Sequence, residues 1–256
     1  MGRTQPLKKY PILETLVLIK EMGFSGVEIC LENNDINPNL LTDELICSIK
    51  NRLDILALDP VSVSYHKNYI YNDSEFLKIK QAIPWTNKFG SNIFIISGGK
   101  KRTKNEGEWS RMLKRTKELV QIAEENNIIL ALEFEPNFVI GTTEELLRLF
   151  NEIPSPNLAA NCDLGHVFLC DPNPLAAIRK TGKKIVHCHI ENMKTNVHDH
   201  LVPEEGDMDL IKYLDCLKKT GFSGGLALDL YKYDYESVGT GSADYLKKLL
   251  ESINKN

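Results

Sequence analysis

The sequence predicts an eight-stranded α/β barrel, (β/α)8, with a short or truncated first strand. Two observations carry this prediction. Short apolar runs alternate with longer amphipathic ones along the whole chain, a rhythm typical of parallel strands joined by helical crossovers. The 256 residues also match the length of one such barrel, which is about 250 residues. Because no linker, low-complexity tract or break in composition interrupts the pattern, we expect residues 1–256 to form a single domain.

Seven apolar runs are short and bounded by turn residues, as strands are. In chain order they lie at 26–30, 55–64, 92–96, 128–133, 158–163, 184–190 and 225–230. A helical pattern precedes the first of them, so one earlier strand is missing. That strand would have to lie within residues 1–6, which are few and rather polar. We therefore expect the first barrel strand to be short and frayed.

Eight amphipathic patterns predict the helices. They lie at 12–22, 43–52, 75–88, 108–126, 144–151, 174–181, 210–220 and 242–253. Thr142, followed three residues later by Glu145, has the capping-box pattern that opens a helix. An open, doubly wound sheet is the alternative to a barrel. It is disfavoured because no Gly-rich phosphate-binding loop opens the first helix, as a dinucleotide fold requires.

Composition and charge exclude several classes of protein. The net charge is -4, so no basic excess supports nucleic-acid binding. No apolar run approaches the roughly 18 residues that indicate a membrane span, and the first residues show no signal-peptide apolar block. We expect a cytoplasmic protein with no membrane partner. The six cysteines show no CxxC spacing and are expected to be buried thiols.

Four consecutive predicted strands finish with a side chain of metal-ligand type, namely Glu133, Asp163, His189 and Asp229. In a parallel barrel these strand ends lie side by side on one face, where barrel active sites are built. Each residue alone could be a polar group facing solvent, but four in register would repel one another unless a cation lay between them. Three carboxylates and one imidazole suit one divalent ion, Mn²⁺ best, with Mg²⁺, Co²⁺ or Zn²⁺ as alternatives.

Other polar residues lie close to these strand ends. His166 should face the barrel mouth from the loop after the sixth strand. His187 shares a strand face with His189, two residues deeper, and should be a hydrogen-bonded core imidazole. Glu28 either forms a structural ion pair or takes part in catalysis, and Glu135 should be solvated beyond its strand.

Six stretches, taken together and in order, resemble one known superfamily. They are GFSGVEIC (23–30), LALEFEP (130–136), NCDLGH (161–166), VHCHIEN (186–192), HDHLVPEEGDMD (198–209) and GFSGGLALDLY (221–231). The resemblance is to the xylose-isomerase-like TIM-barrel superfamily of sugar and sugar phosphate isomerases and epimerases, which also holds AP endonuclease family 2 enzymes of the endonuclease IV type. It spans nearly the whole chain.

The resemblance implies a site and a mechanism. Members acting on ketoses bind one divalent metal through positions matching Glu133, Asp163, His189 and Asp229, and His166 matches a substrate-binding His. The metal would act as a Lewis acid on a hydroxy-ketone, making the neighbouring C–H acidic and stabilising the enediolate. Glu133 and Asp229 would then be base and acid on opposite faces of the sugar. The implied partner is a small sugar or sugar phosphate, and a homo-oligomer is left open.

Three further histidines support two different functions. His66, His198 and His200 are expected to contact substrate, with loop or surface roles as the alternative. In a zinc-dependent abasic-site nuclease with three zinc ions they would be added ligands instead. Against the nuclease, Ser97 stands where such enzymes place a His, and the acidic balance does not help to bind a phosphate backbone. A dehydratase of a cyclic polyol is a further alternative. A metal-free binding protein is disfavoured because clustered unpaired charge is costly.

The chain departs from the ketohexose-epimerase pattern in three places. Asp229 is one methylene shorter than the usual Glu, Thr195 stands where those enzymes carry an Arg, and residues 203–206 read Pro-Glu-Glu-Gly instead of Pro-Gly-Glu-Gly. We therefore expect the enzyme class and not that particular activity. The basic run at 100–104 and the Gly-Thr-Gly at 239–241 could each dock a phosphate, with plain solvated or helix-entry loops as the alternative.

Overall fold

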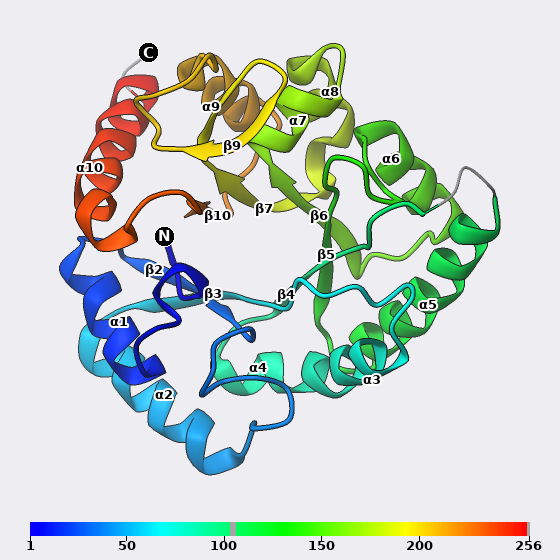
Figure 1. Ribbon diagram of the computed structural model, residues 1–256, viewed down its shortest axis with the longest axis horizontal. Helices are drawn as coiled ribbons and strands as arrows, with labels where there is room; N and C mark the ends of the chain where they lie inside the picture. Colours follow the sequence, from blue (N-terminus) through cyan, green and yellow to red (C-terminus); the bar gives the residue numbers. More distant parts are fainter. Residues whose placement is uncertain (103–105, 255–256) are drawn as a thin grey trace.

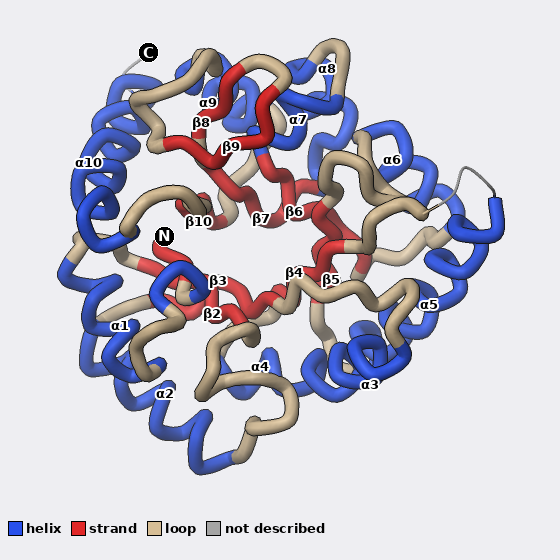
Figure 2. The backbone as a smooth tube through the Cα atoms, viewed as in Figure 1, coloured by secondary structure: helices blue, strands red, loops and turns tan. Residues whose placement is uncertain are grey.

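The computed structural model describes residues 1–102 and 106–254 and shows a parallel barrel surrounded by helices (Figures 1 and 2). The eight barrel strands are hydrogen-bonded in the order β1-β2-β3-β4-β5-β6-β7-β10. They are β1 Gly2–Arg3, β2 Gly26–Cys30, β3 Asp59–Ser64, β4 Ile93–Ser97, β5 Ile129–Glu133, β6 Leu158–Asp163, β7 Ile185–Ile190 and β10 Gly225–Leu228. The predicted fold class is confirmed.

Closure of the barrel depends on the first three residues. β1 pairs with β2 in parallel, and the main chain of Met1 reaches β10 through two hydrogen bonds, Met1 N to Leu226 O at 2.6 Å and Leu228 N to Met1 O at 3.0 Å. The prediction of a short first strand is confirmed. Gly2 and Arg3 are buried, and the expectation that the strand is frayed stays a prediction.

Helices cover the outside of the barrel (Figure 1). They are α1 Ile12–Glu21, α2 Asp43–Leu56, α3 Asp73–Ala82, α4 Thr86–Phe89, α5 Glu106–Glu125, α6 Thr143–Glu152, α7 Leu164–Cys170, α8 Pro174–Thr181, α9 Leu210–Lys219 and α10 Tyr235–Asn254. Thr142 caps α6 by accepting from Glu145 N at 3.2 Å, as the capping-box pattern predicts. Among the described residues, none of these helices has both the length and the apolar character to pass through a bilayer.

Several predicted boundaries are wrong, each for a local reason. α2 continues to Leu56 and ends where Ala57 adopts a left-handed conformation, so β3 begins only at Asp59. The helix predicted at 75–88 is divided because Pro84 lies in a 3-10 turn between α3 and α4. α10 begins at Tyr235, seven residues before the predicted start, so the glycines at 239–241 lie inside a helix and form no phosphate loop.

Two elements were not predicted, and both lie at the mouth of the barrel. Helix α7 directly follows β6. A hairpin made of β8 Asn192–Lys194 and β9 Val197–Leu201 forms its own two-stranded sheet after β7. The hairpin turns at Asn196, whose positive φ of 62° is a conformation that Asn tolerates. These two elements carry three of the candidate histidines.

The cysteines are free thiols, and most of them are buried as expected. The buried ones are Cys30, Cys162, Cys188 and Cys216. Cys170 is only half-buried and Cys47, on α2, is exposed, so the expectation of burial is wrong for these two.

Candidate active site

The barrel brings the four predicted strand-end residues together. Asp163 and His189 are direct register partners on β6 and β7, and Glu133 ends β5. Asp229 is the first residue after β10, and its N–H is hydrogen-bonded to Ile190 O at 3.1 Å. Their side chains converge on His189 Nδ1, which lies 3.1 Å from Glu133 Oε2, 3.6 Å from Asp229 Oδ2 and 3.8 Å from Asp163 Oδ2. Each of the four is at most 3% exposed.

The hydrogen bonds around His189 leave two buried polar atoms without partners at a point where a cation could bind. His189 Nε2 lies 2.9 Å from Glu28 Oε2, which can only accept, so Nε2 carries the proton. In its neutral form the ring presents a lone pair on Nδ1 to three carboxylates, and both Nδ1 and Asp163 Oδ2 are buried without a hydrogen-bond partner. Burial disfavours the imidazolium, yet Glu133 and Glu28 hold the pKa of His189 well above its ordinary value. A metal ion bound by these four residues would satisfy both atoms.

Asp163 owes its orientation to the junction of β6 and α7. Its Oδ1 accepts from His166 N at 2.7 Å and caps the helix, which leaves Oδ2 directed at His189. Gly165, in the first turn, allows Glu191 to approach the helix. A Cβ there would lie 2.2 Å from Glu191 Oε1, which accepts from Gly165 N at 2.8 Å. Burial and two neighbouring aspartates raise the pKa of Glu191 well above its usual range. Sequence reasoning missed Glu191, although it lies two residues after His189.

Arg3 was also missed, and it lies beneath the site. It is 1% exposed, donates from Nε to Glu28 Oε1 at 2.9 Å, and forms an ion pair from Nη1 to Asp229 Oδ1. Of the two interpretations of Glu28, the ion pair is the one the structure contains, and Glu28 also orients His189. The same guanidinium reaches Tyr231 at 3.2 Å, so the short first strand supplies a cation that holds the two sides of the mouth together.

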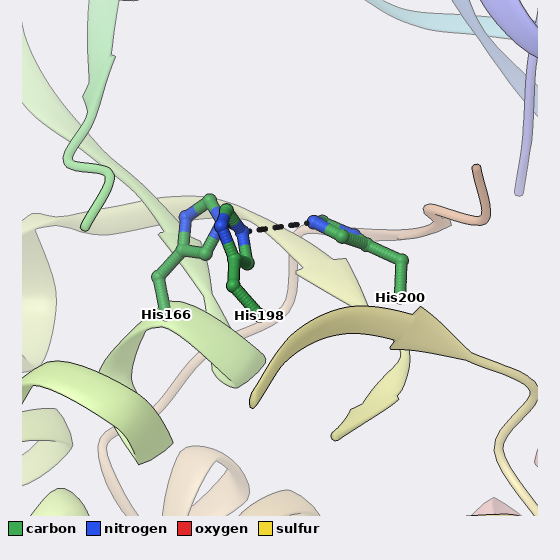
Figure 3. A group of neighbouring side chains, drawn as sticks. All are labelled: His166, His198 and His200. Carbon is green, nitrogen blue, oxygen red and sulfur yellow. Dashed lines mark hydrogen bonds between the residues drawn. The ribbon is translucent and has the colours of Figure 1, made fainter. Parts of the chain in front are cut away.

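His166 from α7 and His198 and His200 from β9 form a second cluster (Figure 3). His166 Nδ1 lies 2.9 Å from Phe134 O and His200 Nδ1 lies 3.1 Å from Asp229 O, so both Nδ1 atoms are donors. Their Nε2 atoms are therefore acceptors, at 3.0 and 3.2 Å from His198 Nε2. His198 has one proton at most to give to two acceptors while it is neutral, and burial with its two neighbours lowers its pKa to about 4. These three nitrogens could also hold a metal ion.

A pocket of about 650 Å³ opens above Glu133. It is lined by His66, which lies 3.7 Å from Glu133 Oε2, and by the three-histidine cluster. Glu135 also lines it and is half-buried, with a pKa raised by burial and by Glu133, so it is solvated only in part. Of the basic run, Lys100 and Arg102 reach the pocket, while residues 103 and 104 lie outside the described residues.

Below the metal-ligand set, His187 has both ring nitrogens hydrogen-bonded. Ser62 Oγ lies 3.0 Å from Nε2 and Asn161 Oδ1 lies 2.8 Å from Nδ1. The ring is fully buried. The expectation of a hydrogen-bonded core imidazole is confirmed.

Comparison with known proteins gives one family and several relatives. A family model described as a xylose isomerase-like TIM barrel matches residues 16–255. Among curated proteins, an uncharacterized protein of Methanocaldococcus jannaschii is 34% identical over 54% of the chain and 48% of its own length. An inosose isomerase of Bacillus subtilis is 29% identical over 46% and 45%, and a D-psicose 3-epimerase of Enterocloster bolteae is 23% identical over 53% and 44%. The chain thus spans about half the length of these relatives in each match.

The fold is also shared with solved structures. The crystal structure described as the IOLI protein with a binding zinc atom superposes with a TM-score of 0.80 at 19% identity, covering 98% of this chain and 97% of that one. At this identity the similarity establishes the fold alone.

Proposed function

Because the chain belongs to the xylose isomerase-like TIM barrel family, we propose that it is a divalent-metal-dependent isomerase or epimerase of a small sugar or sugar phosphate. The observation that carries the proposal is the buried Nδ1 of His189, which has no hydrogen-bond partner and lies within 3.8 Å of three carboxylates. Relatives whose names include an inosose isomerase and a D-psicose 3-epimerase support the same class of reaction.

Glu133, Asp163, His189 and Asp229 would hold the ion. The set of three carboxylates and one imidazole suits Mn²⁺ best and also accommodates Mg²⁺, Co²⁺ or Zn²⁺. When bound, such an ion supplies Lewis-acid polarisation of a carbonyl group. Glu28 contributes indirectly, because its hydrogen bond keeps the proton on the far side of the His189 ring.

Glu133 is the base in this proposal, because its carboxylate lines the pocket. Asn161 Nδ2 donates to Glu133 Oε2 at 2.7 Å and fixes the carboxyl group at the end of β5. Burial alone would favour the neutral acid, but His189 and His66 hold the pKa of Glu133 well below its usual range, so the carboxylate is ready to accept a carbon-bound proton. Asp229, on another side of His189, is the second carboxylate of a proton-transfer pair in the two-base form of this chemistry.

The histidines of the pocket are the substrate-binding residues in this proposal. His66, His166, His198 and His200 line the space next to Glu133 and carry ring nitrogens that bind hydroxyl groups. A sugar fits a pocket of this polarity because each hydroxyl both donates and accepts hydrogen bonds.

A zinc-dependent abasic-site nuclease is the second candidate, and the cluster of His166, His198 and His200 is the observation in its favour, since three imidazoles suit zinc. Against it, Ser97 ends β4 where a further His ligand is needed. The net charge of -4 also gives no general attraction for a phosphate backbone.

One experiment separates the two functions. Purified protein is assayed for bound metal, loaded with Mn²⁺ and incubated in D2O with ketoses, aldoses and their phosphates, while proton NMR follows each carbon-bound hydrogen. We expect deuterium to replace the hydrogen next to a carbonyl group in at least one sugar. Absence of exchange in every sugar, together with nicking of DNA that contains an abasic site, would replace the isomerase proposal with the nuclease.

A further inference from the structure

We infer that this site moves protons on one face of its substrate only, because Arg3 withdraws Asp229 from proton transfer. The chemistry is then a shift of the carbonyl group between neighbouring carbons, an aldose–ketose type of isomerisation, and not inversion of a stereocentre. The inference rests on the proposed function and assigns its reaction class. The evidence for it comes from the contacts of Arg3 and Asp229 and from the residues that line the pocket.

Arg3 is held by carboxylates from two sides of the barrel mouth. Its Nε donates to Glu28 Oε1 on β2 at 2.9 Å, while Nη1 pairs with Asp229 Oδ1 just past β10. All three side chains are at most 1% exposed. A guanidinium is planar and rigid, so two carboxylates that bind different edges of it also fix each other. Asp229 therefore has one oxygen committed to Arg3.

The second oxygen of Asp229 faces the metal-ligand cluster. Asp229 Oδ2 lies 3.6 Å from His189 Nδ1 and 3.5 Å from His200 Nδ1. With Oδ1 on Arg3 and Oδ2 toward the cluster, both oxygens of Asp229 are engaged by protein groups. Of the two carboxylates proposed for proton transfer, Glu133 lines the pocket and Asp229 does not. Proton transfer requires heavy-atom approach of about 3 Å, and of these two carboxylates Glu133 is the one accessible from the pocket.

Among the described residues that line the pocket near Arg3, His66 is a possible base, with Nε2 3.4 Å from Arg3 Nη2, but its Nδ1 lies 3.7 Å from Glu133 Oε2 and so it belongs to the side of Glu133. Tyr231 lies there, but its hydroxyl oxygen already accepts from Arg3 Nη1 at 3.2 Å, and a neutral phenol cannot take up a carbon-bound proton. His200 donates from Nδ1 to the Asp229 carbonyl and directs Nε2 toward His198. Of the four metal-ligand residues, Glu133 is therefore the one whose carboxylate faces the substrate pocket.

A single base suffices for a carbonyl shift. Glu133 takes the proton from the carbon next to the carbonyl, and the C–H electron pair becomes the C=C bond of the enediol. The carbonyl oxygen gains a proton as the neighbouring hydroxyl gives one up, and Glu133 returns its proton to the former carbonyl carbon on the same face. No atom or electron is gained or lost overall. Inversion of a carbinol carbon would instead need a proton from the opposite face, where Asp229 is engaged by Arg3.

The test compares reaction types across a panel of sugars. Mn²⁺-loaded protein is incubated in ordinary water with aldoses deuterated on the carbon next to the carbonyl group, and with ketoses, their phosphates and cyclic ketopolyols. We expect the carbonyl-shifted isomer, with part of the deuterium carried to the neighbouring carbon by the same carboxyl group. Formation of an epimer with complete loss of the label would overturn the one-face inference and leave the proposed function intact. No conversion of any sugar would overturn the proposed function, and this inference with it.

Variants at Arg3 test its positioning role separately from the fold. Removing Arg3 alone takes the one guanidinium away from two buried carboxylates, so Arg3→Gln is combined with Glu28→Gln to keep the local charge balanced, and the amide oxygen at position 28 can still accept from His189 Nε2. Asp229→Glu, introduced into this background, should raise the ratio of epimer to isomer by at least about tenfold. Asp229→Glu combined with Glu28→Gln, with Arg3 present, is the matched control and should leave that ratio unchanged. An equal rise in both backgrounds would show that Arg3 does not restrain the last carboxylate.

A crystal structure of the Mn²⁺-loaded wild-type protein supplies a readout that does not depend on activity. Asp229 Oδ1 should still accept from Arg3 Nη1, with Oδ2 on the metal. Rotation of Oδ1 into the pocket, with Arg3 turned away, would overturn the inference even if the variants fail to fold.

Discussion

Two layers of side chains inside the barrel, two residues apart along the same strands, differ in how completely they are hydrogen-bonded. In the deeper layer, His187 has a hydrogen-bond partner for each ring nitrogen, Ser62 and Asn161. In the layer above, His189 has a partner for Nε2 only, and its Nδ1 faces three carboxylates. Both imidazoles are fully buried. Burial lowers the pKa of His187 to about 3, whereas the carboxylates around His189 raise its pKa well above the ordinary value.

The difference shows how a structural polar layer is told apart from a functional one. Burial is equal in the two layers, so burial does not distinguish them. What distinguishes them is hydrogen-bond satisfaction, because a buried polar atom that lacks a partner is strongly disfavoured unless a ligand supplies one. The deeper layer is therefore complete without a ligand, and the mouth layer is the one where a bound cation would satisfy atoms that lack partners.

The largest expected effect concerns Glu133. Glu133→Gln keeps the size of the side chain but cannot accept a carbon-bound proton, so exchange of substrate hydrogen with solvent should fall by about a thousandfold, equivalent to ~4 kcal/mol of barrier. The rate is measured by NMR at saturating Mn²⁺. Glu135→Gln, two residues later in the same pocket, is the matched control and should retain exchange within about tenfold. Comparable losses in the two variants would remove Glu133 from its role as the base.

Disruption of the deeper layer should act on stability. His187→Ala removes two hydrogen bonds and leaves Ser62 and Asn161 without their partner, so the free energy of unfolding should drop by about 3 kcal/mol. Urea unfolding measures this change. His198→Ala, at an exposed histidine of the pocket, should change the free energy of unfolding by about 0.5 kcal/mol or less. If His187→Ala weakened metal binding and left stability intact, the assignment of a structural layer would be wrong.

Asp163→Asn tests the mouth layer directly. Asn keeps the helix cap of α7 but loses the negative charge, so the dissociation constant for Mn²⁺ should rise by at least about 100-fold, which is ~2.7 kcal/mol. Calorimetric titration measures the affinity. In chelator, the variant should be at least as stable as wild type, because one of three mutually repelling carboxylates is gone. Full metal occupancy in Asp163→Asn would exclude this residue from the site.

The smallest effect is the pH dependence of stability that His187 contributes. The unfolded chain binds the proton near pH 6.5, while the folded protein binds it only near its depressed pKa of about 3. Stability from this group is therefore present above pH 6.5 and is lost as the pH falls toward 3. Between about pH 6.5 and about pH 5 the loss is up to about 2 kcal/mol. Urea unfolding in chelator should show a shallower pH dependence for His187→Gln, and identical profiles would contradict the assignment.

The fold and the four strand-end residues could be predicted because each depends on local pattern. Apolar runs mark strands, and the last residues of parallel strands share one face. Arg3 could not be predicted, since an Arg in a short polar stretch gives no sign that Glu28 and Asp229, the latter 226 residues away, will surround it. Tertiary contacts also account for Glu135, whose burial comes from the wall of the pocket rather than from its own segment.

The hairpin at the mouth illustrates a different limit. His198 and His200 were singled out as residues, but β8 and β9 were not predicted because each strand is short and polar. The Thr195-Asn196 turn was an available signal, since Asn adopts the positive φ that a tight hairpin needs. Thr195 itself contacts Asp207, with its hydroxyl 2.9 Å from Oδ2, so it holds the turn of the hairpin against the loop after β9 and is not among the residues that line the pocket.

The hairpin also means that the barrel scaffold and the residues that line the pocket can change independently of each other. β8 and β9 pair only with each other and take no part in the ring of barrel strands (Figure 2). Yet β9 brings two of the pocket histidines over the ligand set. Under the proposed function, exchange of residues 192–201 would change which hydroxyl groups are recognised, while barrel closure and the four strand-end residues stay as they are.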